Sequence, residues 1–249
     1  MKKIFVLLCA VVLFAVACEK EYPPTADVIY NAVTDYDGNS YDAVRIGNQV
    51  WMASNLRTTH YANGEAIPEG NTLSLTETYR YKPANKKAKV ATYGYLYTQP
   101  ALMHGAAPSE ANPSGVQGVC PNGWHVPSAA EWEQLIDYCA GNPECACSGN
   151  GDNIAKALAA NHGWHKYRED VCSVGNDLSA NNATGFSALP AGYYFGSLDI
   201  DYPNCTYFWS ATSDYGPQWR YGLSFMSRSV DRIPGITAPF PCSVRCVRD

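Results

Sequence analysis

Residues that could do acid–base or metal chemistry are scattered along this 249-residue chain. His162 and His165 have the H-x2-H spacing of two metal ligands, but no third ligand is evident beside them, so we expect a surface pair and no metal site. Two carboxylates that converge can act as a general acid and a general base. Four aspartates lie in segments that we expect to be loops: Asp199, Asp201, Asp214 and Asp231. Loop aspartates are mostly solvated, and we expect these to be so.

The sequence lacks the motifs of common catalytic sites, since it has no G-x-S-x-G, H-E-x-x-H or Walker sequence. Its charge also disfavours one class of partner. Without Lys2 and Lys3, which lie in an apparent export signal, the 18 basic residues fall to 16 against 23 acidic ones, a net charge of −7. Such a chain is poorly suited to bind nucleic acid. We therefore expect a non-catalytic protein without a cofactor and without a nucleic-acid partner.

The first residues indicate export. Residues 1–17 begin with two lysines after Met1 and continue as an apolar run too short for a comfortable membrane span, which predicts a signal peptide. The end of this run, Ala-Val-Ala-Cys18, resembles the lipobox of bacterial lipoproteins, and the resemblance implies lipidation of Cys18. Ordinary cleavage to a soluble secreted chain is the alternative. Residues 18–33 contain EKEYPPT and are expected to form the lipid-anchored N-terminus and a polar tether.

Eight cysteines remain once Cys9 leaves with the signal peptide and Cys18 carries lipid. They are Cys120, Cys139, Cys145, Cys147, Cys172, Cys205, Cys242 and Cys246. An even number of cysteines in an exported protein indicates disulfides, although the residues alone leave the connectivity open. Their spacings lack the C-x2-C pair that is usual in zinc sites.

The stretch CPNGWHVPSAAEWEQL, residues 120–135, combines types that occur in active sites, but its pattern predicts the start of a helix. Ser128 followed three residues later by Glu131 is a capping box, in which each side chain bonds to the backbone of the other. An apolar stripe at i, i+3, i+4 and i+7 follows and consists of Trp132, Leu135, Ile136 and Cys139. We therefore assign Glu131 a structural role, in a helix that ends near Gly141.

The remaining signals predict an α+β fold. The turn dipeptides Asp37-Gly38 and Gly47-Asn48 separate three apolar runs, which is typical of an antiparallel meander. A second helix is expected from residue 152 or 153 to residue 160. Short apolar runs such as YFWSATS and SVRCVRD follow and indicate further strands. Strands, two helices and strands in that order, with long loops and disulfides, make an α+β domain.

Six sequence blocks, in this order, resemble the signature of one protein family: TDYDGNSYDAVRIGNQVWMASNL, YGYLY, GVCPNGWHVPSAAEWEQL, TGFSALPAGYY, FWSAT and SVRCVRD. The chain is similar, over residues 34–249, to the Fibrobacter succinogenes major paralogous domain. This family occurs in exported and lipid-anchored proteins of Bacteroidetes and Fibrobacteres and has no defined activity. Residues 139–173 are richer in cysteine than the family pattern, and we expect extra disulfides to staple a long loop there.

The latter half also resembles a C-type-lectin-like fold, with WHVPSAAEWEQL as the start of its first helix and SVRCVRD as a closing strand that returns beside the start of the domain. The resemblance implies a disulfide between Cys120 and Cys246. Calcium-dependent sugar binding is not expected, because the Glu-Pro-Asn and Trp-Asn-Asp runs that hold calcium in such lectins are missing. Formylglycine-generating enzymes of the same fold family use a cysteine pair with copper, which Cys242 and Cys246 match only loosely.

These observations predict a lipid-anchored binding or adhesion module at the outer membrane, exposed at the cell surface, whose partner is a glycan or a surface protein. Aromatic side chains in the C-terminal region could stack on a ligand, with core packing as the alternative for each. They are Tyr193, Tyr194, Tyr202, Tyr215 and Trp219. Two other functions stay open: an accessory component of a surface appendage, and an enzyme of formylglycine-generating-like fold. Glu19 and Glu21 resemble residues that direct some Bacteroidetes lipoproteins to the outer face of the membrane.

Overall fold

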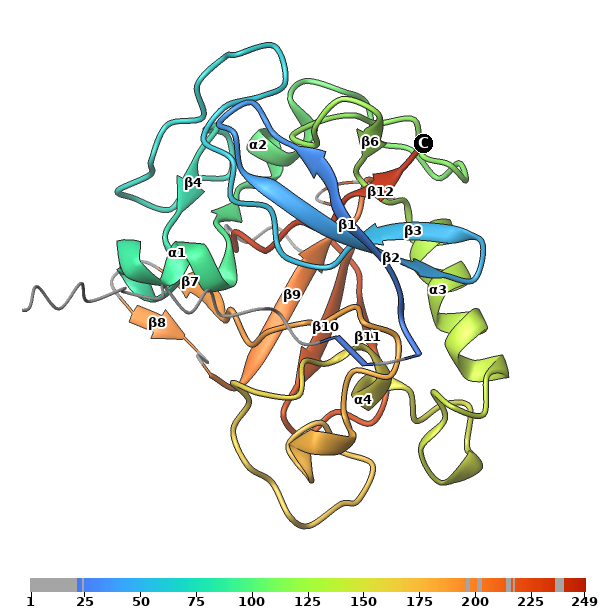
Figure 1. Ribbon diagram of the computed structural model, residues 1–249. Coiled ribbons are helices and arrows are strands. Elements are labelled where there is room, and N and C mark those ends of the chain that lie inside the picture. Colours follow the sequence, from blue (N-terminus) through green and yellow to red (C-terminus); the bar gives the residue numbers. More distant parts are fainter. Residues whose placement is uncertain are drawn as a thin grey trace, which may run out of the picture.

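The computed structural model describes residues 22–23, 25–195, 198–200, 203–213, 216, 218–235 and 240–249, and for residues 194–195 and 198–200 it describes the backbone alone. The expected signal peptide, Cys18, Tyr202 and Tyr215 lie outside the described residues. The fold is a mixture of helices and antiparallel sheets with disulfides, as the sequence predicts (Figure 1). None of the described helices is long and apolar enough to cross a membrane.

The largest sheet joins the two ends of the described chain. Its strands are β1 (Asp27–Thr34), β2 (Ser40–Ile46), β3 (Gln49–Met52), β6 (Trp124–His125) and β12 (Val247–Arg248). Their order is β1-β2-β3-β12-β6, so the last strand lies between β3 and β6. The expected meander is confirmed, and its second turn begins at Gly47, whose φ of 59° suits the first position of a two-residue hairpin turn. Strand β1 also corrects one boundary, because residues 27–33 were expected in the tether and belong to the sheet.

Three smaller sheets complete the strand content of the described residues. A three-stranded sheet has the order β11-β10-β9, and two hairpin-like pairs join β4 to β5 and β7 to β8. Their bounds are β4 (Arg80–Tyr81), β5 (Leu96–Tyr97), β7 (Tyr193–Phe195), β8 (Leu198–Ile200), β9 (Cys205–Trp209), β10 (Arg220–Ser224) and β11 (Asp231–Ile233). All of these pairings are antiparallel.

Four α-helices occur among the described residues, where the sequence predicted two. They are α1 (Lys87–Tyr93), α2 (Gln99–Met103), α3 (Ala129–Gly141) and α4 (Ala155–Leu158), and single 3-10 turns occupy Pro83–Asn85, Cys147–Gly149 and Leu178–Ala180. The sequence does not predict α1, and over residues 93–102, which include most of α2, it does not distinguish a strand from a short helix. Both helices are too short to show a helical period. Helix α4 is shorter than expected because Ala159 leaves the helix and forms a bridge with Ala188.

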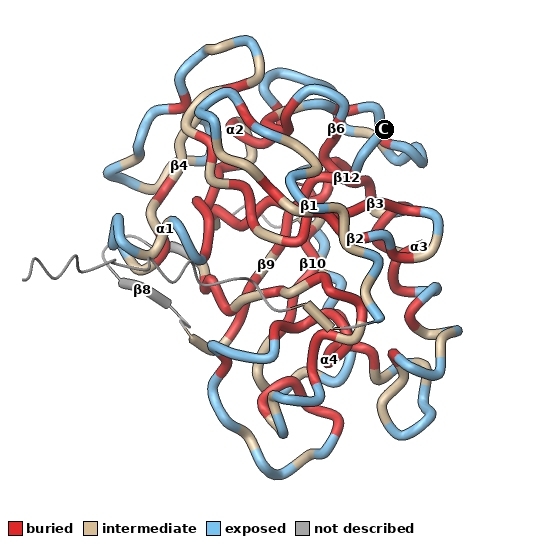
Figure 2. Tube along the Cα trace, in the orientation of Figure 1, coloured by how far each residue is buried: buried red, intermediate tan, exposed pale blue. Residues whose placement is uncertain are grey.

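Helix α3 confirms the predicted cap and buried stripe, and it connects two sheets. Ser128 accepts from the Glu131 amide while Glu131 accepts from the Ser128 amide. The Trp132 ring lies 4.7 Å from the ring of Trp51 in β3 and 5.0 Å from that of Tyr221 in β10, measured between centroids. One aromatic side chain therefore packs against both sheets in the interior, which Figure 2 shows as a continuous buried region under exposed loops.

Two disulfides occur among the described residues. Cys120 and Cys246 are joined, with Cα atoms 6.0 Å apart and a sequence separation of 126 residues, which is the pair that the lectin-like resemblance implies. Cys147 and Cys172 are joined within the cysteine-rich insertion, where extra bridges were expected. Four further cysteines are buried outside these two disulfides: Cys139, Cys145, Cys205 and Cys242.

Candidate functional site

A cavity of about 850 Å³ lies among segments that are far apart in the sequence. Its described lining comes from Tyr22, from the loop after β3, from helix α1, from two loops around residues 161–189 and from the approach to β12. The lining residues are Tyr22, Ala53, Ser54, Asn55, Arg57, Ala91, Thr92, Asn161, His162, Asn182, Ser187, Leu189 and Arg245. This volume is in the range of pockets that hold small molecules.

Arg245 is the most unusual residue of this lining, because its side chain is only 1% exposed and carries a charge. Its Nε donates to Asn55 Oδ1 at 2.7 Å, and its Nη1 donates to the Met52 and Phe186 carbonyl oxygens at 2.8 and 2.6 Å. Its Nη2 donates to the Ser187 carbonyl oxygen at 3.0 Å. A guanidinium has five N–H donors. One Nη2 hydrogen therefore has no acceptor among the described residues.

No carboxylate among the described residues forms an ion pair with Arg245. Its acceptors are neutral, and its guanidinium carbon lies 4.6 Å from the centre of the Phe186 ring. Burial lowers the pKa of Arg245 to about 9, against a slight upward effect of the nearby Tyr22. A buried charge without an opposite charge is costly, and an anion in the cavity would reduce that cost.

Two further lining residues offer unused polar atoms. Arg57 donates from Nη2 to the Ser40 carbonyl oxygen at 2.8 Å and lies over the Tyr41 ring, while its remaining donors have no acceptor among the described residues. Ser54 has a buried hydroxyl oxygen without a hydrogen-bond partner among the same residues. The described lining contains no aspartate, glutamate or cysteine. The cavity is therefore rich in donors and positive in charge.

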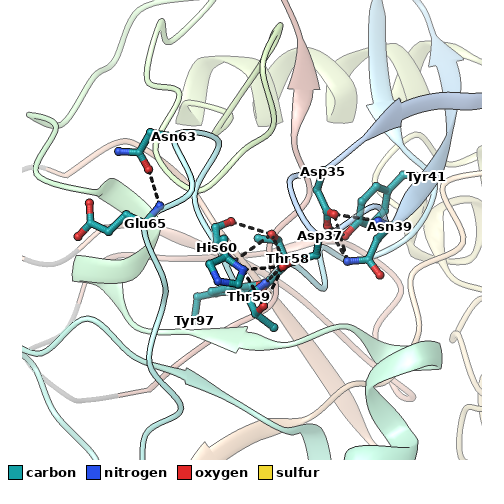
Figure 3. A network of polar contacts seen from close by, with 10 residues as sticks. All are labelled: Asp35, Asp37, Asn39, Tyr41, Thr58, Thr59, His60, Asn63, Glu65 and Tyr97. Carbon is teal, nitrogen blue, oxygen red and sulfur yellow. Dashed lines mark hydrogen bonds and ion pairs between the residues drawn. The ribbon is translucent and has the colours of Figure 1, made fainter.

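The loop that carries Arg57 is held by the polar network of Figure 3. Asp37 accepts from the Thr59 amide, from both threonine hydroxyls at positions 58 and 59, and from His60 Nδ1 at 2.5 Å. Burial alone would raise the pKa of Asp37, but these hydrogen bonds lower it to about 2. The same loop also contacts β5, where the Tyr97 hydroxyl donates to the Thr58 carbonyl oxygen at 2.8 Å. The Arg57 backbone is thus fixed by contacts to the first hairpin and to β5.

Tyr41 completes the support for this loop. The Arg57 amide donates to the Tyr41 hydroxyl at 3.0 Å, and the hydroxyl donates to Asp35 at 2.6 Å. Burial raises the pKa of Tyr41 far above its ordinary value, with Asp35 adding to the rise. Tyr41 therefore keeps its proton, and its hydroxyl stays a donor to Asp35.

The aromatic residues predicted as ligand contacts do not line this cavity where the structure describes them. Tyr193 is partly buried, and its ring packs edge-on against Tyr207 and Phe240 at centroid distances of 5.8 and 5.4 Å. Trp219 is also partly buried, next to β10. The Tyr194 side chain, Tyr202 and Tyr215 lie outside the described residues. The predicted aromatic site stays a prediction, and the structure adds a different site.

Where the structure describes them, the residues considered for acid–base and metal chemistry do not form one cluster. His162 lines the cavity, whereas the His165 ring packs 5.2 Å from the Phe225 ring. Asp231 lies in β11, while the Asp199 side chain, Asp201 and Asp214 fall outside the described residues. No cluster of three metal-ligating side chains occurs in the part of the chain that the structure describes.

The two cysteines considered for copper binding, Cys242 and Cys246, differ in bonding state, because only Cys246 forms a disulfide. Cys246 is bonded to Cys120, so it has no free thiol with which to form a copper pair with Cys242. Cys242 itself is completely buried, and burial raises the pKa of its thiol to about 12. A thiol in this state is a poor nucleophile at neutral pH.

His125, in the stretch that first suggested an active site, pairs with buried Glu131 and with Asp249, whose side chain is 62% exposed. Its Nε2 lies 2.6 Å from Glu131 Oε1 and its Nδ1 lies 2.6 Å from Asp249 Oδ1, with both the histidine and Glu131 side chains 2% exposed. Burial opposes the charged imidazole, but the two hydrogen-bonded carboxylates outweigh it and raise the pKa of His125. The cluster is satisfied internally, which confirms a structural role for Glu131.

Sequence reasoning did not identify Arg245 or Arg57 as site residues. Arg245 lies in SVRCVRD, which was assigned to a strand, and a single arginine there has no spacing signal that marks it as buried. Side chains alternate between two faces in an extended segment, so the neighbouring Val244 and Cys246 do not predict that Arg245 is buried.

Comparison with known proteins identifies a family whose model covers most of the residues that line the cavity. The chain has no match among curated proteins and none among solved structures. The family model described as the Fibrobacter succinogenes major domain matches residues 44–248, which include every described lining residue except Tyr22. That range is more than half of the chain. The chain belongs to the Fibrobacter succinogenes major domain family.

Proposed function

We propose that this protein is a non-catalytic binding module, anchored by lipid at Cys18 in the outer membrane and exposed at the cell surface. The body would be a C-type-lectin-like scaffold, stapled by the Cys120–Cys246 disulfide, whose ligand is a glycan or a protein. The export signal and the lipobox-like sequence support the location. The return of β12 to the first sheet and the disulfide support the scaffold.

The cavity around Arg245 is the observation that carries this proposal. It has the volume of a small-molecule pocket, and its walls come from segments that the sheets and the disulfide hold in place. Its described lining supplies hydroxyl, amide and guanidinium groups and one imidazole, that of His162, and contains no carboxylate or thiol. Such a lining suits recognition of a polar ligand, and we favour a glycan as that ligand.

An array of glycans and glycoproteins tests the proposal. The chain from residue 19 to residue 249, with its disulfides formed, is applied with calcium and again with a chelator. We expect binding that survives the chelator. Ala91→Trp, on the exposed part of α1 that lines the cavity, should abolish binding, and Ala88→Trp, on the same helix but outside the lining, should not.

Two results would count against the proposal. If nothing on the array binds, a glycan-receptor function is excluded. A protein partner in the cell envelope would then be favoured, including an accessory role in a surface appendage. Equal loss of binding in Ala91→Trp and Ala88→Trp would show that the cavity is not the site. Binding that requires calcium would contradict the calcium-free recognition proposed here.

A further inference from the structure

Arg245 combines two properties that a purely structural arginine does not need. It lies in the wall of a cavity, and one of its Nη2 hydrogens has no acceptor among the described residues. A structural role explains the four hydrogen bonds that tie the guanidinium to Met52, Asn55 and the 186–187 backbone. It does not explain an N–H donor that lacks an acceptor in a residue that lines a cavity.

Lys156 shows what a structural buried cation looks like in the same molecule. Its ammonium group is 6% exposed and donates to three carbonyl oxygens, those of Ser173, Asn176 and Asp177. An ammonium has three donors, so all of them are used. Lys156 is not among the residues that line the cavity. Arg245 differs in having a remaining donor and a space beside it.

Arg57 adds a second cation to the same lining. Its guanidinium is partly exposed, uses one nitrogen on Ser40 and has no carboxylate partner among the described residues. The loop that holds it is fixed by the Asp37 and Tyr41 contacts. Two guanidinium groups line one cavity, one buried and one partly exposed, and together they suit a planar anionic group.

We infer that the cavity binds a saccharide that carries a carboxylate, with the acidic group held by Arg245 and Arg57. The polar remainder of the lining suits sugar hydroxyls, since the Ser54 hydroxyl is buried and lacks a partner in the described structure and Thr92 and Asn161 lie exposed at the cavity. This inference rests on the proposed glycan-binding function and narrows it to acidic sugars.

Calorimetric titration at low ionic strength tests the inference with three probes: glucuronate, glucose and acetate. We expect glucuronate to bind on the order of tenfold or more tightly than glucose, because a charge-assisted hydrogen bond distinguishes them. Acetate should bind more weakly than glucuronate, because it has the carboxylate but not the hydroxyls. Arg57→Gln should weaken glucuronate binding on the order of tenfold and leave glucose binding unchanged.

Arg168→Gln is the matched control, since it removes the same charge from an exposed residue outside the cavity lining. Its glucuronate affinity should equal that of the wild-type protein. If Arg57→Gln and Arg168→Gln weaken binding equally, only the net charge matters and the inference is overturned. Equal affinity for glucose and glucuronate overturns the acidic-sugar inference but leaves glycan binding intact. If acetate binds as tightly as glucuronate, the cavity does not recognise a saccharide. If neither sugar binds and no ligand on the array binds, both proposals are overturned.

Discussion

His125, which contacts Asp249, and Arg245 are both buried basic side chains, but their polar surroundings differ. His125 lies between two carboxylates at 2.6 Å each, in a cluster with no further need of a partner. Arg245 is surrounded by neutral acceptors, retains an unused N–H and borders a cavity. A buried charge that is neutralised inside the fold stabilises it, whereas one that is left without a counter-charge is available for a ligand.

The Cys120–Cys246 disulfide links the two regions, and its removal should have the largest effect. Cys120 precedes the strand of His125, and Cys246 follows Arg245. We expect the double change Cys120→Ser and Cys246→Ser to lower the free energy of unfolding by about 4 to 5 kcal/mol in the chain-entropy model, measured by urea denaturation. A loss confined to glucuronate binding, with unchanged stability, would show that the bridge supports only the cavity.

Arg245→Met should have the next largest effect. The change leaves three backbone carbonyl oxygens and the Asn55 amide oxygen without their donor, so we expect a loss of about 3 kcal/mol in unfolding free energy. Denaturant unfolding at pH 7 measures it. A variant more stable than the wild-type protein would mean that the unpaired charge costs more than its hydrogen bonds return, and it would sharpen the contrast with His125.

Glu131→Gln tests the His125 cluster through its pH dependence. Because the folded-state pKa of His125 is raised above 6.5, the stability from its charged form is present below pH 6.5 and is lost as pH rises through the folded pKa. We expect the variant to be about 1 to 2 kcal/mol less stable than the wild-type protein at pH 6, with the difference shrinking toward alkaline pH.

Glu133→Gln is the control for that experiment, since Glu133 is on the same helix and pairs with Arg232, which does not titrate in this range. Its stability difference from the wild-type protein should stay constant between pH 6 and pH 9. If Glu131→Gln shows the same constant difference, the charged state of His125 does not contribute to stability.

Asp37→Asn should give the smallest change in stability, because Asp37 only holds the loop that carries Arg57 beside the cavity. The pKa of Asp37 is lowered to about 2, so its contribution is present above pH 3.8 and is lost as pH falls toward 2. We expect the variant to lose about 1 kcal/mol of unfolding free energy at pH 6. It should also bind glucuronate more weakly, because the loop that carries Arg57 loses its hydrogen bonds to Asp37. Asp27→Asn, which breaks an exposed pair with Arg45, should change neither quantity.

The helix cap beside His125 could be predicted from the sequence, but the contacts of His125 with Glu131 and Asp249 and the cavity around Arg245 could not. A capping box and an apolar stripe are local patterns, so Ser128, Glu131 and Trp132 were placed correctly. The first meander followed from its turn dipeptides in the same way. The cavity is lined by segments as distant in sequence as those of Arg57 and Arg245, which come together only through tertiary contacts. No local sequence pattern predicts such contacts. The short helix α2 could not be distinguished from a strand, although Thr98 caps it and Pro100 lies in its first turn.

A titration of the ¹⁵N-labelled protein with glucuronate tests the central contrast most directly, because NMR can follow the Arg245 guanidinium and the His125 ring nitrogens in one sample. The account predicts a saturable shift of the Arg245 side-chain resonance, with the His125 resonances unchanged. A shift at His125 without one at Arg245, or no shift at either, would contradict the claim that the unpaired buried charge marks the ligand site.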